Sequence, residues 1–255
     1  MIEPTGWHYG QVTSNALNVR REPSRAAQRW NNVWPMNRLV LVKPSSVDGW
    51  YETTYRGERA YVMADFIKVT ENPVPDNIVE RMLYMVQPEK GCSKSVYFNG
   101  YGGKWCHRFA DWLAMNAGVS KQLIPNTSYC GKGIVWFATN ERSGGFYFTS
   151  MEHKARLIRA YVNLRNQTEE LTEVERAYIP SPGDYVYFRW KRASRTVNVS
   201  HVGIVAAVGD TKIKTWEGNA GGKVDQREYS LSDIQIVGFG HPNYMSDISD
   251  SILSV

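Results

Sequence analysis

Short apolar or alternating runs separated by turn residues fill the first part of the chain, up to residue 69. Four such runs lie at residues 16–20, 39–42, 50–55 and 59–62. The last two flank an Arg-Gly-Glu turn, and prolines and serines follow the first two. Several short strands at this spacing predict a small β-barrel.

A polar stretch with two prolines, residues 71–77, interrupts this pattern and predicts a linker. Beyond it, residues 106–117 carry apolar side chains at helical spacing and end at Gly118, a residue type that commonly closes a helix. A second helical pattern covers residues 151–166. The chain then returns to strand patterns, at residues 185–190, 199–208, 212–216 and 234–238.

Helices followed by strands with short connections indicate an α+β fold with an antiparallel sheet. The sequence therefore predicts a β domain at residues 1–70, a linker at 71–89 and an α+β domain at 90–245.

The net charge and the composition limit the kinds of binding partner to expect. The net charge is +5 and the pI is near 9.0, which favours a polyanionic partner such as a cell envelope. The basic residues are scattered and form no run or stripe, so nucleic-acid binding is not expected. No apolar stretch is long enough to span a membrane, and the chain does not start with a signal peptide. The 42% hydrophobic share is typical of a globular protein.

Cys106 is the best nucleophile candidate among the three cysteines. It begins the predicted helix at 106–117, and unpaired N–H groups and the helix dipole at that end stabilise a thiolate. Cys92 and Cys130 lie in segments predicted as irregular, with no helix behind them. An odd number of cysteines leaves at least one thiol free, and a buried inert thiol is the structural alternative.

A nucleophilic thiol needs a base, and His201 is the candidate. His107 follows Cys106 directly, but successive helix residues diverge by about 100°, so His107 is expected to pair with Asp111 on the exposed face. His201 opens the apolar strand 201–205, a position at the edge of a sheet. A lone histidine is more often structural than catalytic, so a catalytic role for His201 depends on which side chains follow it on the neighbouring strand.

The return strand after His201 offers Glu217 and Asn219. If the hairpin loop has three residues, 209–211, Val208 pairs with Lys212 and both side chains lie on the histidine's face. One of them could then hold the imidazole in the required tautomer. A two-residue loop would turn both side chains away from His201.

The N-terminal part resembles bacterial SH3-like (SH3b) domains. The resemblance lies in Leu-Asn-Val-Arg at residues 17–20 with Glu-Pro-Ser at 22–24, in Gly-Trp-Tyr-Glu at 49–52, and in residues 60–66. It implies attachment to cell-wall peptide, and a spacer without a ligand is the alternative.

The C-terminal part resembles the CHAP family of cysteine amidases and peptidases, which have a papain-like fold. The resemblance is carried by the segments 105–106, 116–118, 182–186, 200–205 and 217–219. By this resemblance Cys106 is the nucleophile, His201 the base, Glu217 the orienting acid and Asn219 an assisting amide. The backbone N–H of Cys106 is expected to supply one oxyanion donor, and the upstream segment at Tyr101 a second.

The resemblance implies a peptidoglycan hydrolase that works through a Cys thioester. It would be an N-acetylmuramoyl-L-alanine amidase or a stem or cross-bridge endopeptidase, such as an endolysin. The alternatives are an inactive cell-wall-binding protein and a thiol-dependent acyl or peptide transferase. Neither a cofactor nor a metal is expected. The expected protein is a monomer, extracellular or in the cell wall, secreted or phage-delivered, peripheral to the envelope and bound to bacterial peptidoglycan.

Overall fold

Two antiparallel sheets, with helices packed on them, form the structure, a computed structural model that describes residues 6–93, 103–190 and 199–244. The chain divides into two compact units. The described residues of Met1–Gly103 and Trp112–Lys121 form the first unit, and those of Lys104–Asp111 and Gln122–Ser246 form the second. An α+β fold with antiparallel sheets is therefore confirmed.

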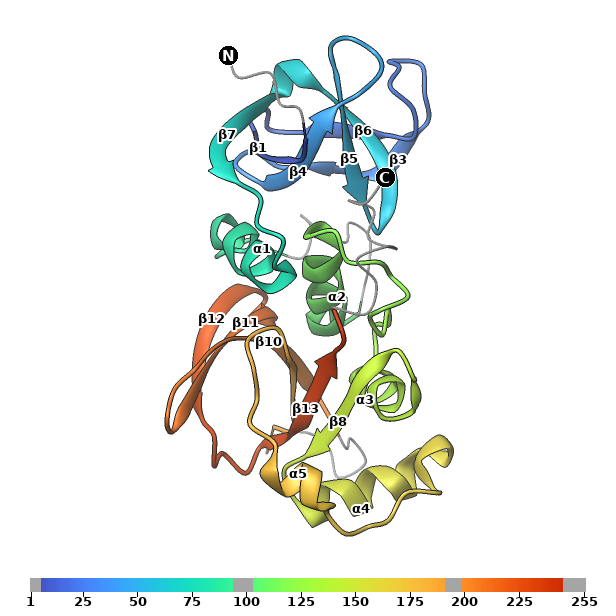
Figure 1. Cartoon of the computed structure of the whole chain (residues 1–255), viewed down its shortest axis with the longest axis vertical. Coiled ribbons are helices and arrows are strands. Elements are labelled where there is room, and N and C mark those ends of the chain that lie inside the picture. The colour runs from blue at the N-terminus through green and yellow to red at the C-terminus, as the bar shows by residue number, and fades with distance from the viewer. Residues whose placement is uncertain (1–5, 94–102, 191–198, 245–255) are drawn as a thin grey trace. The chain divides into compact units, whose positions relative to one another are not determined.

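The first unit contains a seven-stranded sheet in the order β3-β2-β6-β5-β4-β1-β7 (Figure 1). Its strands are β1 (His8–Val12), β2 (Leu17–Arg20), β3 (Arg29–Trp34), β4 (Leu39–Pro44), β5 (Trp50–Tyr55), β6 (Glu58–Met63) and β7 (Ile67–Pro73), with the 3-10 turn η1 (Ala64–Phe66) before β7. Buried apolar side chains alternate with less buried ones in β2 and at the end of β6, and the buried set belongs to one core. The four predicted strands are present as β2, β4, β5 and β6.

The predicted linker at residues 71–89 contains regular structure. β7 continues to Pro73, and helix α1 (Ile78–Met85) follows. Asn77 caps this helix, because its Oδ1 accepts hydrogen bonds from the N–H groups of Val79 and Glu80. The 3-10 turn η2 (Gln87–Glu89) completes the segment. The segment is therefore not an extended linker, and the predicted domain boundaries stay a prediction.

A buried ion pair ties η2 to the sheet of the first unit. The guanidinium of Arg38, just before β4, contacts both carboxylate oxygens of Glu89, at 3.0 and 3.2 Å. Both side chains are almost fully buried. The Arg38 guanidinium also lies over the ring of Trp112, 4.8 Å from its centroid.

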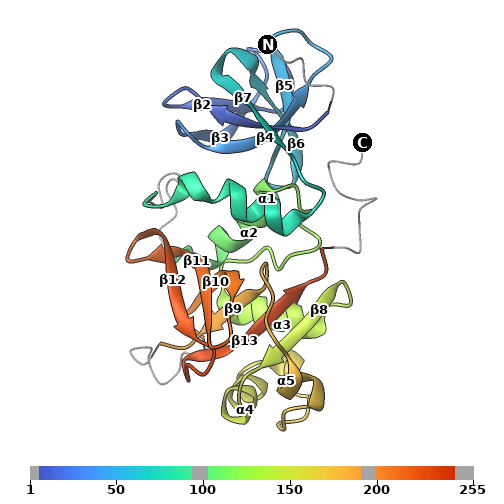
Figure 2. The same cartoon turned by 60° about the vertical axis from the view of Figure 1, so that its left-hand side comes forward.

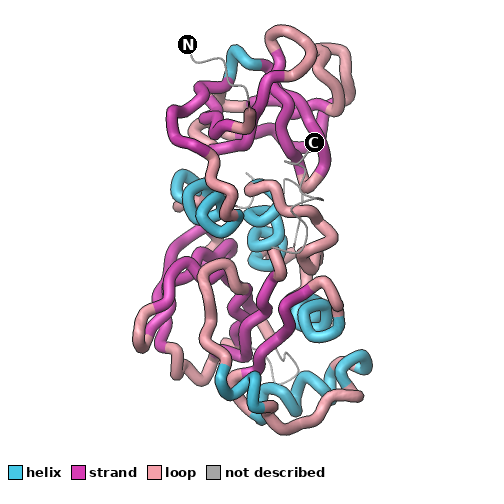
Figure 3. The backbone as a smooth tube through the Cα atoms, in the orientation of Figure 1, coloured by secondary structure: helices cyan, strands magenta, loops and turns pink. Residues whose placement is uncertain are grey.

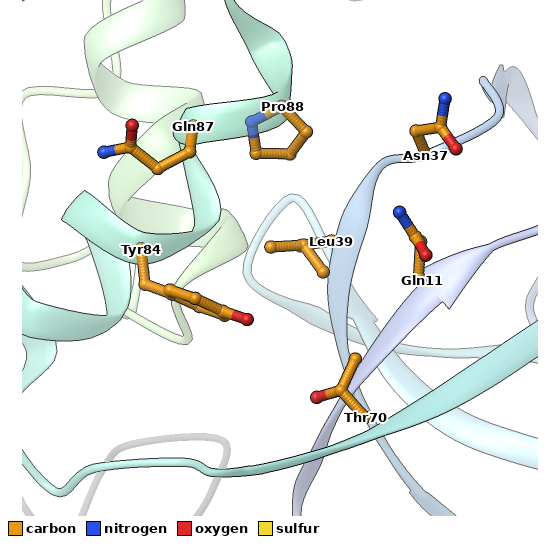
Figure 4. Close-up of a pocket in the computed structure, with 7 residues that line it drawn as sticks. All are labelled: Gln11, Asn37, Leu39, Thr70, Tyr84, Gln87 and Pro88. Atoms are coloured by element: carbon orange, nitrogen blue, oxygen red, sulfur yellow. The ribbon is translucent and has the colours of Figure 1, made fainter.

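A pocket of about 420 Å³ opens between α1 with η2 and the sheet. Figure 4 shows the residues that line it, Gln11, Asn37, Leu39, Thr70, Tyr84, Gln87 and Pro88. Among the described residues, the buried Oγ1 of Thr70 has no hydrogen-bond partner. The pocket therefore offers amide and hydroxyl groups beside an aromatic ring.

The second unit contains a six-stranded sheet in the order β12-β11-β10-β9-β13-β8 (Figures 1 and 2). Its strands are β8 (Ser143–Phe148), β9 (Tyr185–Phe188), β10 (His201–Val208), β11 (Lys212–Ala220), β12 (Lys223–Ser230) and β13 (Ile236–Pro242). Every pairing is antiparallel, as predicted. Figure 3 shows the strands in magenta and the helices in cyan.

The helices are α2 (Cys106–Asn116), α3 (Cys130–Thr139), α4 (Met151–Ala160) and α5 (Glu173–Ala177), with the 3-10 turn η4 (Val162–Leu164) after α4. Helix α2 ends at Asn116, one residue before the predicted end, and the predicted closing residue Gly118 has a left-handed φ of 94°. The helical pattern at 151–166 is α4 followed by η4. No described helix is long and apolar enough to cross a membrane.

Candidate active site

Cys106 is the first residue of α2, and its side chain is buried. The first-turn N–H groups of a helix have no acceptor within the helix, so they face the thiol with partial positive charge. The glycine at position 218 of β11 lets α2 approach closely, because a Cβ there would collide with Phe109 and Trp105. The nucleophile candidate is thus fixed between a helix end and the sheet, as the sequence predicted.

His201 is the first residue of β10, opposite Phe188 on β9. The rings of Phe188 and Trp190 lie 6.1 and 5.6 Å from its imidazole, measured between centroids. The imidazole is only 5% exposed. The aromatic neighbours therefore restrict the orientations that the ring can take.

Glu217 on β11 contacts the imidazole directly. Its Oε2 lies 2.8 Å from Nε2 of His201, and its Oε1 accepts a hydrogen bond of 2.7 Å from the Thr215 hydroxyl. The carboxylate is fully buried, with the Arg227 Nε 3.9 Å from Oε2. Since Nε2 faces Glu217, Nδ1 is the ring nitrogen left for Cys106.

The hairpin reaches the predicted register by a different route. Val208 pairs with Ile213, not with Lys212, so the three-residue loop with the predicted pairing is wrong. The Gly209 N–H donates to the Lys212 carbonyl, which closes the turn one residue tighter. An extra residue in β10, Ala206, then shifts the pairing back, so that Ile204 lies opposite Trp216. Continued by one residue, this register sets Glu217 opposite Gly203 on the face of His201.

Asn219 is not brought to the imidazole in the same way. Its φ is 63°, and the pairing of β11 with β12 is irregular between Glu217 and Ala220. Within the described part of the chain, the structure shows no hydrogen bond between the Asn219 amide and His201. The assisting role of Asn219 stays a prediction.

The charged forms of Cys106, His201 and Glu217 stabilise one another. A hydrogen bond from Cys130, together with the hydrogen bond and charge of His201, lowers the pKa of Cys106 well below its usual range, although burial opposes it. Burial alone would lower the pKa of His201, but Cys106 and Glu217 outweigh it and raise that pKa to about 9. Burial likewise opposes ionisation of Glu217, yet His201 and Thr215 lower its pKa. The arrangement favours a thiolate, an imidazolium and a carboxylate.

The position of Cys130 differs from the one expected from the sequence. The sequence places it in a loop, whereas the structure makes it the first residue of helix α3. Its Sγ lies 3.9 Å from Sγ of Cys106, and both thiols are buried. The segment 130–139 was missed because its glycines at 131 and 133 disfavour a helix, although Ile134 and Phe137 show helical spacing from Cys130.

The position of His107 corrects a second expectation from the sequence. His107 pairs with Asp111 as expected, Nδ1 to Oδ2 at 3.1 Å, but both side chains are buried and not on an exposed face. Nε2 of His107 lies 2.9 Å from the Tyr187 hydroxyl, and the Tyr185 hydroxyl donates to Asp111. Burial lowers the pKa of His107, but the charge and hydrogen bond of Asp111, together with the charge of Cys106, outweigh burial and raise it. This network anchors the first turns of α2 to β9.

Tyr101, the predicted second oxyanion donor, lies outside the described residues. Cys92 is a partly exposed cysteine after η2 that is not in a disulfide. Among the residues that the structure describes, no three His, Cys, Asp or Glu side chains cluster as a metal site.

Comparisons with known proteins bear on the same segment. The family model of the CHAP domain matches residues 96–219, a range that holds Cys106, His201, Glu217 and Asn219. Two solved structures, NlpC2 and NlpC1 from Trichomonas vaginalis, are each similar to the chain with 20% identity and a TM-score of 0.31. The similarity covers 93% of this chain, and 72% and 69% of theirs. No curated protein matches the chain.

Proposed function

We propose that this chain is a cysteine hydrolase that cleaves amide bonds in bacterial peptidoglycan. CHAP domains are typically cysteine hydrolases of the amidase type, and the CHAP match covers residues 96–219. The observation that carries the proposal is the line of three groups: Cys106 at a helix start, the imidazole of His201, and Glu217 at 2.8 Å from Nε2 of that imidazole.

In the first half-reaction the Cys106 thiolate attacks the amide carbonyl carbon. The N–H of Cys106 is aimed from the helix start at the oxygen that becomes negative. His201 gives its proton to the leaving amine, while Glu217 stabilises the imidazolium and keeps the ring oriented. The products are a thioester on Cys106 and a free amine.

In the second half-reaction water hydrolyses the thioester. The neutral His201 now takes a proton from water, and hydroxide adds to the thioester carbonyl. Collapse of the adduct releases the acid and restores the thiolate–imidazolium pair. The bond cleaved is a muramoyl–alanine amide or a peptide bond of the stem or cross-bridge.

The first unit is proposed to hold the chain on the wall as an SH3-like module. Its pocket supports this role, because the Gln11, Asn37 and Gln87 amides suit the amide-rich stem peptides. The proposed location is accordingly extracellular or in the cell wall. Co-sedimentation of Cys106→Ala with sacculi tests this, and an additional Gln87→Ala exchange is expected to weaken retention. Equal retention of the two variants argues against the pocket.

The test of activity uses purified sacculi. The full chain is expected to release new amino groups and soluble muropeptides, whose masses identify the bond. Cys106→Ala is expected to release none, whereas Cys92→Ala, at a thiol that has no role in the proposed mechanism, is the matched control and retains activity. Release of amino groups by Cys106→Ala at the rate of the unaltered chain would refute the proposal.

A further inference from the structure

Two helices begin at facing sulfur atoms. Cys106 opens α2, Cys130 opens α3, and their Sγ atoms are 3.9 Å apart. Both side chains are buried, so the packing around them holds the two thiols close to each other. The proposed hydrolysis uses only one of them, which leaves the second without an assigned task.

The start of α3 is held in place by close packing. A Cβ at Gly131 would collide with the Tyr161 hydroxyl, and one at Gly133 would collide with His107. The backbone beside Cys130 therefore cannot move away easily. The Cys130 side chain keeps its place opposite Cys106, and rotation of the two side chains is the motion available to bring the sulfur atoms together.

The two thiols differ in protonation. The hydrogen bond between the two thiols lowers the pKa of Cys106 and raises that of Cys130. This difference favours a thiolate at Cys106 beside a protonated thiol at Cys130. A thiolate reacts with peroxides to give a sulfenic acid, and a neighbouring thiol resolves that acid to a disulfide.

We propose that Cys106 and Cys130 form a reversible disulfide that switches the nucleophile off when the protein meets hydrogen peroxide. A disulfide needs an S–S distance of about 2.05 Å, so the sulfur atoms approach by about 2 Å. The formation of the disulfide follows from the two thiols alone. The resulting loss of hydrolysis rests on the proposed function.

The chemistry balances in two steps. The Cys106 thiolate attacks one peroxide oxygen, an S–O bond forms, the O–O bond breaks, and the departing hydroxide takes the proton held by His201 to become water. The sulfur of Cys130 then attacks the sulfenic sulfur, the S–S bond forms and the S–O bond breaks. The proton of Cys130 leaves with the hydroxyl group as a second water. Two thiols are oxidised by two electrons, and peroxide is reduced to two waters.

The first experiment maps the disulfide directly. The full chain is treated with hydrogen peroxide, free thiols are blocked with N-ethylmaleimide, and a non-reduced digest is measured by mass spectrometry. The expected result is a linked peptide pair containing Cys106 and Cys130, about 2 Da below the sum of the reduced peptides, with Cys92 blocked. A link to Cys92, or Cys106 found only as sulfinic acid, would overturn the proposal.

The second experiment measures reversal. Peroxide is expected to abolish hydrolysis of sacculi, and dithiothreitol to restore most of it. In Cys130→Ser no resolving thiol is present, so prolonged peroxide carries Cys106 to sulfinic acid and recovery is expected to fall about tenfold. Cys92→Ser, the matched control, recovers like the unaltered chain. Equal recovery in Cys130→Ser would also overturn the switch.

The two proposals fail separately. If the untreated chain hydrolyses no sacculi, the proposed function fails while the peptide map still decides the disulfide. If hydrolysis is present and no linked pair forms, only the switch fails.

Discussion

Nε2 of His201 lies 2.8 Å from Oε2 of Glu217, and this contact assigns the two nitrogens of the imidazole. The carboxylate accepts from Nε2–H, so Nδ1 is directed to the Cys106 side. The fully buried Glu217 has the Thr215 hydroxyl on its other oxygen. The imidazole orientation therefore depends on a carboxylate that water does not reach.

Removing the charge of Glu217 tests this dependence. Glu217→Gln keeps the shape of the side chain but no longer stabilises the imidazolium, so the hydrolysis rate is expected to fall by about one to three orders of magnitude. Initial rates on a soluble muropeptide measure the effect, and thermal unfolding shows whether the fold is kept. A rate equal to that of the unaltered chain, with the fold intact, would exclude an electrostatic role for Glu217.

The pH dependence of the rate follows from the two coupled groups. His201 must keep its proton to give it to the leaving amine, and its pKa is raised to about 9, so activity is expected to fall as the pH rises through that value. The lowered pKa of Cys106 keeps the thiolate present below the usual range of a thiol. Rates against pH check both limbs. In Glu217→Gln the alkaline limb should move to lower pH, because the carboxylate no longer raises the pKa of His201.

A substitution at Gly203 tests the close packing against Glu217. A Cβ at Gly203 would lie 2.8 Å from Cγ of Glu217, so Gly203→Ala is expected to displace the carboxylate and lower the rate by about tenfold or more. Gly209→Ala in the same hairpin is the control, because its Cβ meets only the Lys212 carbonyl at 3.6 Å. Rates and melting temperatures of both variants separate a displaced Glu217 from general destabilisation. If the two variants behave alike, the contact has no special importance.

The ion pair of Arg38 and Glu89 is predicted to matter for stability. Arg38→Met leaves a buried carboxylate without its partner, which costs about 3–5 kcal/mol of unfolding free energy. Lys121→Met is the control, since Lys121 and Glu58 are half-exposed and such pairs contribute under about 1 kcal/mol. Urea unfolding of the two variants gives the comparison. Similar losses in both would mean that burial of the pair has no energetic consequence.

The same ion pair bears on the predicted boundary at residue 70. Deleting residues 1–70 removes Arg38 and also the Leu39 carbonyl, which accepts a hydrogen bond from Asn116. A cut after η2 removes Arg38 and Glu89 together and is expected to give the more soluble fragment of the two. Expression and solubility of both fragments locate the boundary.

Sequence patterns predicted most of the site because its residues sit at ends of regular elements. Cys106 at a helix start and His201 at a strand start were visible as changes in periodicity. The register that brings Glu217 to His201 was predicted through a loop length, and the pairing at Val208 shows that loop to be wrong. A bulge residue such as Ala206 has no sequence signature of its own, since it is set by how the sheet packs.

Helix α3 was missed for a different reason. Gly131 and Gly133 lower helix propensity by about 1 kcal/mol each relative to alanine, and a local pattern cannot show what offsets this. The offset comes from the Tyr161 hydroxyl and from His107, which occupy the space a side chain would need. Partners distant in sequence thus decide that Cys130 begins a helix and faces Cys106.

The extra residue at Ala206 marks a place in the hairpin where the chain can change in length without a change in the pairing near His201. Substitutions or a short insertion at the turn, residues 210–211, lie beyond the bulge from His201 and leave the pairing of Ile204 with Trp216 in place. Deletion of Ala206 would remove the bulge and make Val205 and Ala207 neighbours in a regular ladder, with Ile204 still opposite Trp216. A hairpin one residue shorter at this position would therefore keep its histidine beside the glutamate, with the same turn.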